Sequence, residues 1–281
     1  MNAVKTVVLL GLLTALIIFI GGMAGGQGGM VIALGIAALM NFVSYWFSDK
    51  IVLAMHGAKE VDERQAPELY AIVANLTQKA GVPMPRLYVV DNPSPNAFAT
   101  GRNPSHAAVA ATTGLLKLMS REEVEGVLAH ELAHVKNRDI LISSIAATLA
   151  GAIMVLANIV RWGAIFGGFG GRDDEGRGVN PLGLLVTAIV APIAALLIQM
   201  AISRSREYQA DATGAQIAGN PYGLASALKK LGQVSARIPM GTSPAVGHLY
   251  IVNSLSGRSL FNLFSTHPPL EERIARLLGR A

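Results

Sequence analysis

Four long apolar runs constrain this chain more than any other feature of its sequence. Residues 4–20, 30–47, 140–160 and 179–203 are almost free of charged side chains. Each run is long enough to cross the hydrocarbon core of a bilayer as a helix. Only 15% of all residues are charged, which also favours a membrane protein over a soluble domain. We therefore expect four transmembrane helices, arranged as two hairpins.

The first two runs are joined by the glycine-rich residues 21–29, which predicts a tight turn between two spans. The aromatic residues 45–47 resemble an interfacial belt, and Asp49 and Lys50 mark the exit to water. A cleaved signal peptide is the alternative for the first run. It is disfavoured because a second apolar run follows almost directly.

The polar stretches between the runs predict the domain organisation. We expect a transmembrane hairpin over 1–48, the first half of a cytoplasmic domain over 49–139, a second hairpin over 140–203 and the second half over 204–281. Lysine and arginine residues cluster on one side of the spans, which predicts that this side is cytoplasmic. The flanking basic residues are Lys50, Lys59, Arg64, Lys136, Arg138, Arg204 and Arg206.

The overall composition narrows the possible chemistry and partners. Cysteine is absent, so any metal site must use histidine and carboxylate ligands. The net charge of +5 is not accompanied by a nucleic-acid-binding motif, and we interpret it as an orientation signal in the membrane. We expect a lipid bilayer as a partner and no nucleic acid.

Residues 127–134 read V-L-A-H-E-L-A-H and contain the H-E-x-x-H zinc signature. On a helix, His130 and His134 project from nearly the same side, so both imidazoles can bind one Zn²⁺. Glu131 lies beside them and can act as the general base. Ser120 and Glu123 predict a capping box that starts this helix. The alternative is a chance match, with the histidines in the core or on a solvated face.

A second segment can complete a metal site. Glu207 and Asp211 are spaced i, i+4, directly after the fourth apolar run. A hairpin of two spans returns the chain to the side of the membrane that it left. The helix with Glu207 and the H-E-x-x-H helix should therefore lie on the same side of the membrane. We expect Glu207 to be the third zinc ligand and Asp211 to accept the free N–H of a zinc-bound histidine. The alternative for Glu207 is an ordinary ion pair with Arg204.

Short strands precede the H-E-x-x-H helix. Residues 86–91, 96–100 and 107–113 are predicted to form a small sheet, after a helix that starts at Pro67 and ends before Gly81. An exposed sheet edge can hold an extended peptide through main-chain hydrogen bonds. The candidates for this contact are Asn96, Ala97 and Phe98. An ordinary hairpin without substrate contact is an equally good interpretation.

The C-terminal region contributes two further candidates. A helix is predicted from Asn220 and Pro221 to about residue 237, and a last helix, capped by Ser265 or Thr266, to residue 278. A site that attacks an amide needs a cation or a hydrogen-bond donor near the developing oxyanion. His267 and Arg273 could supply one. Helix capping and a surface ion pair are the alternatives. The histidines left as structural or surface residues are His56, His106 and His248.

In this order, H-E-L-A-H, E-Y-Q-A-D, N-A-F-A-T-G and S-T-H-P-P-L-E-E-R-I resemble the HtpX-type membrane zinc metalloproteases, a group related to the Ste24 CAAX proteases. The resemblance covers nearly the whole chain. It implies an α+β membrane protein with a predominantly helical, zincin-like (gluzincin) catalytic domain, a small sheet and four transmembrane helices. It also implies one Zn²⁺ held by His130, His134 and Glu207, with Glu131 as the base and His267 and Arg273 near the oxyanion.

The resemblance further implies a multi-pass enzyme of the bacterial cytoplasmic (inner) membrane. Such an enzyme hydrolyses misfolded or damaged membrane proteins at the cytoplasmic face, as part of quality control and the stress response. The sequence is compatible with two other functions. One is a CAAX-type protease of prenylated peptides, and the other is a membrane scaffold with a structural zinc. The scaffold is disfavoured because structural zinc sites are usually closed by four protein ligands, and three are evident.

Overall fold

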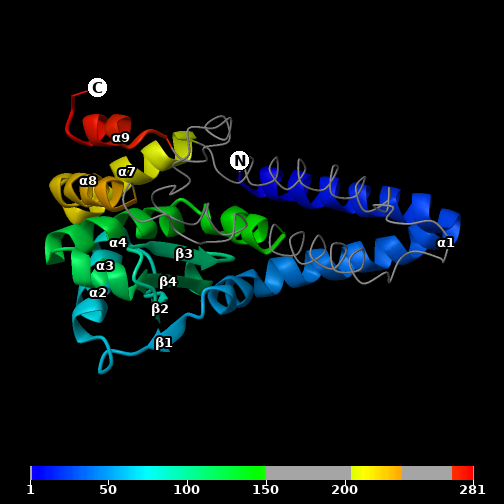
Figure 1. Ribbon diagram of the computed structural model, residues 1–281, viewed down its shortest axis with the longest axis horizontal. Helices are drawn as coiled ribbons and strands as arrows, with labels where there is room; N and C mark the ends of the chain where they lie inside the picture. The colour runs from blue at the N-terminus through cyan, green and yellow to red at the C-terminus, as the bar shows by residue number, and fades with distance from the viewer. Residues whose placement is uncertain (1, 150–203, 236–267, 281) are drawn as a thin grey trace, which may run out of the picture.

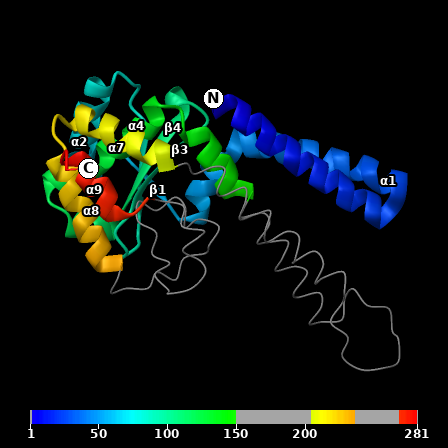
Figure 2. The ribbon, with the colours of Figure 1, turned by 90° about the horizontal axis from the view of Figure 1, so that it is seen from above.

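The computed structural model describes residues 2–149, 204–235 and 268–280. In this part of the chain, a long helix, α1 (Asn2–Met55), extends away from a group of shorter helices that surround a small sheet (Figure 1). Turned by 90°, the same view shows the helical group at one end and the far end of α1 at the other (Figure 2). Of the predicted second hairpin, residues 140–203, only residues 140–149 are among the described residues.

Helix α1 doubles back on itself at the glycine-rich turn (Figures 1 and 2). Gly26 has a φ of +56°, a conformation that glycine adopts without steric cost. The two arms of α1 are joined by a hydrogen bond of 2.9 Å from Asn41 Nδ2 to Thr14 Oγ1. Within the described residues, only Gly26–Met55 is long and apolar enough to cross a membrane, and Thr6–Phe19 and Ile140–Leu149 are shorter apolar helices. Four spans therefore remain a prediction.

The sheet is mixed and has four strands. The strands are β1 (Lys59–Val61), β2 (Arg86–Val90), β3 (Ala97–Gly101) and β4 (Ala107–Thr112). Their order is β1-β2-β4-β3, with β2 and β4 parallel and the other pairs antiparallel. The strands predicted over 86–91, 96–100 and 107–113 are confirmed to within a residue or two at each end. The helical elements with a small sheet are those expected for the fold class.

Strands β3 and β4 are buried on both faces of the sheet, and successive residues of β4 point to opposite faces. Val109 faces a core that contains Leu76 and Leu128, from the helices on one side. Ala110 faces a second core that contains Val52 of α1 and Ala147 of the Ile140–Leu149 helix. The end of α1 is therefore anchored to the sheet by apolar packing.

The remaining helices pack around one central helix, α4 (Arg121–Lys136). It contacts the sheet through β3 and lies under the two helices α7 and α8 (Figure 1). The other helices are α2 (Pro67–Ala80), the short 3₁₀ helix η1 (Pro104–His106), α3 (Thr113–Leu118), α7 (Arg204–Ala218), α8 (Tyr222–Ser235) and α9 (Leu270–Leu277). Helix α2 begins and ends where the sequence predicts, with Gly81 at its C-cap in the left-handed region (φ 68°).

Two helix boundaries were not indicated by the sequence. Helix α1 continues past the predicted exit to water at Asp49 as far as Met55, because Val52 and Leu53 are buried against the sheet. Helix α9 begins at Leu270 with Pro269 at its N-cap and no side-chain cap, so the predicted cap by Ser265 or Thr266 is wrong. Proline lacks a backbone N–H and disfavours a helical residue before it, which places the start of α9 after the prolines.

Candidate metal centre

The local sequence of α4 presents the H-E-x-x-H side chains as predicted. Ser120 accepts a hydrogen bond from the Glu123 backbone N–H, and Glu123 accepts one from the Ser120 N–H, so the capping box is confirmed. His130 and Glu131 are 1% and 6% exposed, because α4 is covered by other elements on several sides. The centre is therefore built on a rigid, buried helix.

Helix α7 approaches α4 very closely at one glycine. A Cβ atom on Gly214 would lie 2.9 Å from both N and Cα of His130, which is closer than packed atoms tolerate. The missing side chain thus allows the two helix backbones to meet at the first histidine. This contact places Glu207, earlier on α7, over the histidine pair.

His130, His134 and Glu207 converge on one point. Their closest ligand atoms lie within 4.8 Å of one another. The two Nε2 atoms are 3.2 Å apart, and Glu207 oxygens lie 3.7 Å from His130 Nε2 and 3.6 Å from His134 Nε2. A tetrahedral ion with bonds of about 2.0–2.1 Å would have ligand atoms about 3.3–3.4 Å apart. The three side chains therefore fit a metal ion with only small adjustments.

The other nitrogen of each histidine faces an aspartate. His130 Nδ1 lies 2.9 Å from Asp211 Oδ1, and His134 Nδ1 lies 3.3 Å from Asp139 Oδ2. Such contacts fix the tautomer, so that Nε2 carries the lone pair for a metal. Burial opposes the charge on His134, but the Asp139 hydrogen bond and nearby carboxylates raise its pKa to about 9 overall. The negative surroundings thus favour positive charge at this position.

Arg273 links the centre to the C-terminal helix α9. Its side chain is fully buried and donates from Nε and Nη2 to the two oxygens of Asp211, at 2.8 and 2.7 Å. Its Nη1 lies 3.7 Å from Glu207 Oε2. Burial alone would raise the pKa of Asp211, but the hydrogen bonds from Arg273 and His130 lower it, which keeps Asp211 ionised. Asp211 therefore bridges Arg273 and His130.

Glu131 is oriented by the sheet. Its Oε2 accepts a hydrogen bond of 2.9 Å from the backbone N–H of Ala99 on β3. Burial raises the pKa of Glu131, although the neighbouring histidines and this hydrogen bond oppose the shift. A raised pKa suits a carboxylate that has to take up a proton and release it again near neutral pH.

The outer edge of β3 is partly occupied. The side chains of Asn96, Ala97 and Phe98 are buried, and the main chain of Asn96 bonds Thr112. In an antiparallel pair, alternate residues direct their N–H and C=O groups away from the partner strand. The outward N–H of Ala99 bonds Glu131, and that of Gly101 bonds Ser144 Oγ at 3.2 Å. Of the outward N–H groups of β3 in the described residues, that of Ala97 remains as a candidate for a peptide contact.

The structure places most of the predicted site residues together and adds Asp139, which the sequence did not indicate. His130, Glu131, His134, Glu207, Asp211 and Arg273 are brought together, whereas His267 lies outside the described residues. Asp139 follows the end of α4, where the sequence indicates only a boundary between segments. The signal in the sequence is its position five residues after His134; in the structure, Arg138 with a φ of +59° turns the chain at this point.

We expect an Asp139→Asn variant to bind its metal about 10–100-fold more weakly, as is typical when the partner of a metal-bound histidine is changed. The amide can still bond His134 but carries no charge to support the imidazole. Zinc titration against a competing chelator measures the change. Asp91→Asn is the matched control, since Asp91 is exposed and accepts a hydrogen bond from Thr113 Oγ1, away from the metal centre. An unchanged affinity for zinc would show that Asp139 does not support His134 as a metal ligand.

Comparisons with known proteins agree with this geometry. A model of peptidase family M48 matches residues 63–281. A protein named Protease HtpX homolog from Desulfatibacillum aliphaticivorans is 64% identical, over 99% of this chain and 89% of its own length. The homolog of the same name from Syntrophobacter fumaroxidans is 61% identical, over 97% of each chain.

One solved structure shares the fold at low sequence identity. The crystal structure of S. mikatae Ste24p aligns with a TM-score of 0.53 and 19% identity, over 98% of this chain. The chain spans 65% of the length of that structure. The likeness supports the arrangement of elements described above.

Proposed function

Because this chain belongs to peptidase family M48, we propose that it is a zinc-dependent endopeptidase of the bacterial cytoplasmic membrane. The observation that carries the proposal is the convergence of His130, His134 and Glu207 beside the buried carboxylate of Glu131. The enzyme hydrolyses peptide bonds, and we propose that its physiological substrates are misfolded or damaged membrane proteins.

The donor set favours zinc. Two imidazoles and one carboxylate are the ligands of many catalytic zinc sites, and three protein ligands leave a fourth position open. Zinc bound there would supply Lewis acidity, which polarises a carbonyl group and makes a water molecule more acidic. His130 and His134 would bind through Nε2, because their Nδ1 atoms face Asp211 and Asp139. We propose one Zn²⁺ per chain.

Glu131 carries the proton transfers in this proposal. Its carboxylate accepts a proton from the water that attacks the peptide carbonyl and passes it to the leaving amine. The hydrogen bond from Ala99 holds one carboxylate oxygen in place. The burial that raises its pKa makes protonation easier during this cycle.

Arg273 is proposed as a cation near the negative charge that develops on the substrate. The fully buried guanidinium bonds Asp211 and lies 3.7 Å from Glu207 Oε2, so it also holds these two carboxylates in position. His267 is proposed as a hydrogen-bond donor to the same charge. The main chain near Ala97 is proposed to pair with an extended substrate, with Asn96 and Phe98 shaping the strand beside it.

We propose that the peptidase domain sits at the cytoplasmic face and that the chain crosses the membrane four times. The apolar helix Gly26–Met55 supports the first hairpin. The basic residues beside the spans support the orientation.

Removal of the metal tests the function. We expect a chelator to abolish cleavage of an unfolded protein such as casein by the purified full-length chain, and stoichiometric zinc to restore it. Magnesium added alone should not restore cleavage, because it prefers octahedral oxygen ligands. Full activity after the metal has been removed completely would contradict the proposal. Cleavage confined to prenylated peptides would instead favour the CAAX-type specificity.

A further inference from the structure

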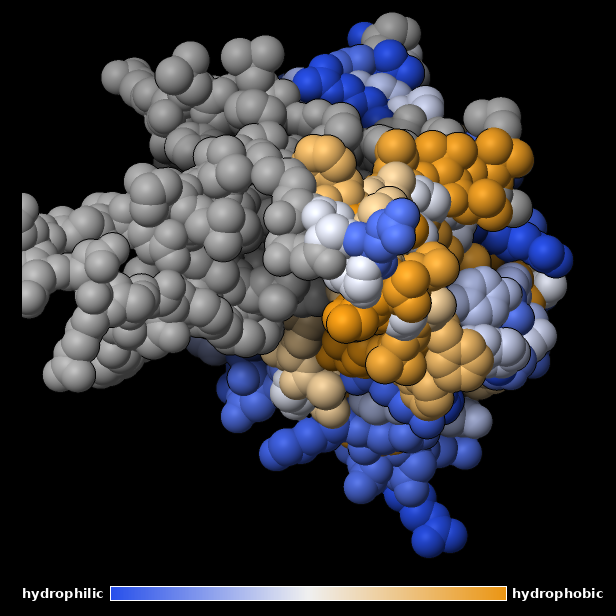
Figure 3. All heavy atoms as spheres, turned by 90° about the vertical axis from the view of Figure 1, so that its right-hand side faces the viewer, coloured by the Kyte–Doolittle hydropathy of each residue, from blue (hydrophilic) through white to orange (hydrophobic). Residues whose placement is uncertain are grey.

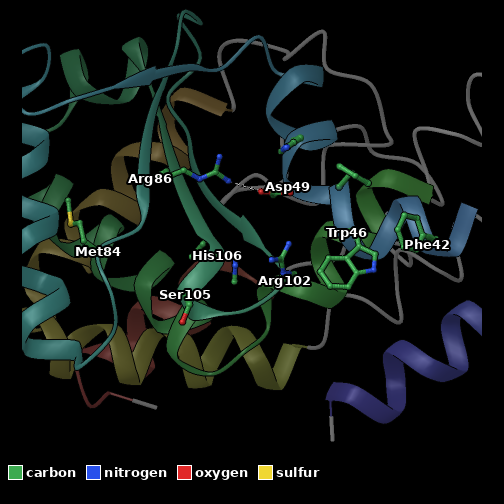
Figure 4. A pocket seen from close by; sticks show the side chains of 11 residues that line it. Phe42, Trp46, Asp49, Met84, Arg86, Arg102, Ser105 and His106 are labelled. Atoms are coloured by element: carbon green, nitrogen blue, oxygen red, sulfur yellow. Dashed lines mark hydrogen bonds and ion pairs between the residues drawn. The ribbon is translucent and has the colours of Figure 1, made fainter.

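A cavity of about 720 Å³ lies away from the metal centre, between the end of α1 and one end of the sheet. Phe42, Trp46 and Lys50 line it from α1, while Arg86 and Arg102 line it from the sheet and the loop after β3 (Figure 4). This volume lies within the range of about 300–1,000 Å³ that is usual for ligand sites.

The polar part of the cavity carries a surplus of positive charge. Three basic side chains, Lys50, Arg86 and Arg102, face a single acidic one, Asp49. Arg86 Nη2 pairs with Asp49 Oδ2 at 2.7 Å. Among the described residues, no carboxylate lies within ion-pair distance of Lys50 or Arg102. Two cations thus remain available to an anion.

Aromatic rings hold these two cations at the end of the apolar helix. The Arg102 guanidinium lies 4.8 Å from the centre of the Trp46 ring, and Lys50 Nζ lies 5.5 Å from that of Phe47. Cation–π contacts of this kind keep a basic group in place without neutralising it. The rings lie where an interfacial aromatic belt is expected, between the bilayer and water.

The other part of the cavity is continuous with the exposed apolar surface of α1. Phe42 and Trp46 occupy one face of the helix, at i and i+4, and are 55% and 44% exposed. Leu39, one turn further into the predicted span, is 63% exposed. Figure 3 faces the turn of α1 and shows apolar side chains gathered in the middle of the view, with polar side chains towards its edges. Such a surface suits an acyl chain.

We propose that this cavity binds the phosphate of an anionic glycerophospholipid, with its acyl chains along α1. An inorganic phosphate or an acidic peptide would use the cations but not the apolar wall, which is why a lipid fits better. The inference rests on the membrane placement proposed above and is independent of the peptidase chemistry. The bound lipid would tie the end of α1 to the sheet through Lys50 and Arg102.

Lipid binding to the delipidated full-length protein, measured by native mass spectrometry, tests the proposal. We expect phosphatidylglycerol to bind about tenfold or more tightly than phosphatidylcholine with the same acyl chains, since basic groups near a membrane attract anionic lipid. The Lys50→Gln/Arg102→Gln variant should lose this preference. Lys50→Arg/Arg102→Lys, which keeps both charges, should retain most of it.

The matched control is Arg121→Gln/Lys229→Gln, which removes the same charge from exposed positions on α4 and α8 and should keep the preference. Equal affinity for the two lipids in the unmodified protein, or an equal loss in the control, would overturn the proposal. Displacement of the lipid by inorganic phosphate would identify free phosphate as the ligand instead. Casein cleavage is assayed separately, so a failure of the peptidase function and a failure of lipid binding are distinguishable.

Discussion

A Glu131→Gln variant is expected to retain its metal and to hydrolyse peptides about a hundredfold to ten-thousandfold more slowly, the usual contribution of a general base. The amide keeps the size of the side chain but cannot accept the proton of the attacking water. The geometry of His130 and His134 should not change, because Glu131 is bonded to Ala99 rather than to either histidine. Zinc content and the initial rate of casein cleavage, measured on the same preparation, check the result.

Glu125→Gln is the matched control for this experiment. Glu125 lies on the same helix and loses the same charge, but it pairs with Lys79 at the surface, at 3.6 Å. Surface pairs of this kind contribute little to stability. The control should therefore cleave at nearly the unmodified rate. A Glu131→Gln protein with full activity would refute the assignment of the base, even if the metal site were correct.

A Glu207→Ala variant is expected to lose both metal and activity. Removal of one of three protein ligands should weaken zinc binding by about a hundredfold or more. This loss exceeds the 10–100-fold that is typical when a residue hydrogen-bonded to a metal ligand is changed. Only the two imidazoles of α4 would then hold the ion. Zinc titration against a chelator, followed by casein cleavage in excess zinc, measures the two effects separately.

Gln209→Ala is the control on the same helix, since Gln209 is exposed and its truncation leaves the centre intact. Circular dichroism of both metal-free proteins shows whether α7 remains folded. Unchanged zinc affinity in a folded Glu207→Ala protein would remove Glu207 from the coordination sphere. The two histidines would then need a different third ligand.

The local features of the catalytic helix could be predicted well from sequence. The capping box at Ser120 and the i, i+4 spacing of His130 and His134 depend on residues within one or two helical turns. The strands and the end of α2 at Gly81 were likewise predictable from turn residues and alternation. The formation of these elements depends mainly on residues close to them in sequence.

Other boundaries depended on partners far away in sequence. Helix α1 continues to Met55 because Val52 packs against the sheet, and no local pattern indicates that surface. The sequence predicts a peptide contact at Asn96, Ala97 and Phe98 of β3. It does not indicate that the outward N–H groups of Ala99 and Gly101, further along the strand, bond Glu131 and Ser144. Which main-chain groups remain available is decided by the helices that lie along the edge.

The sequence by itself determined the ligand types, their spacing on α4 and the absence of thiolate ligands, because these follow from residue identity and helical geometry. The sequence also predicts Glu207 and Asp211 as partners of the histidines. Only the tertiary structure decided the distances at which they meet, that Asp139 faces Nδ1 of His134, and that Arg273 is fully buried. The physical reason is that these contacts depend on how helices pack. Gly214 illustrates it, since the close approach of α7 to His130 requires a position without a side chain.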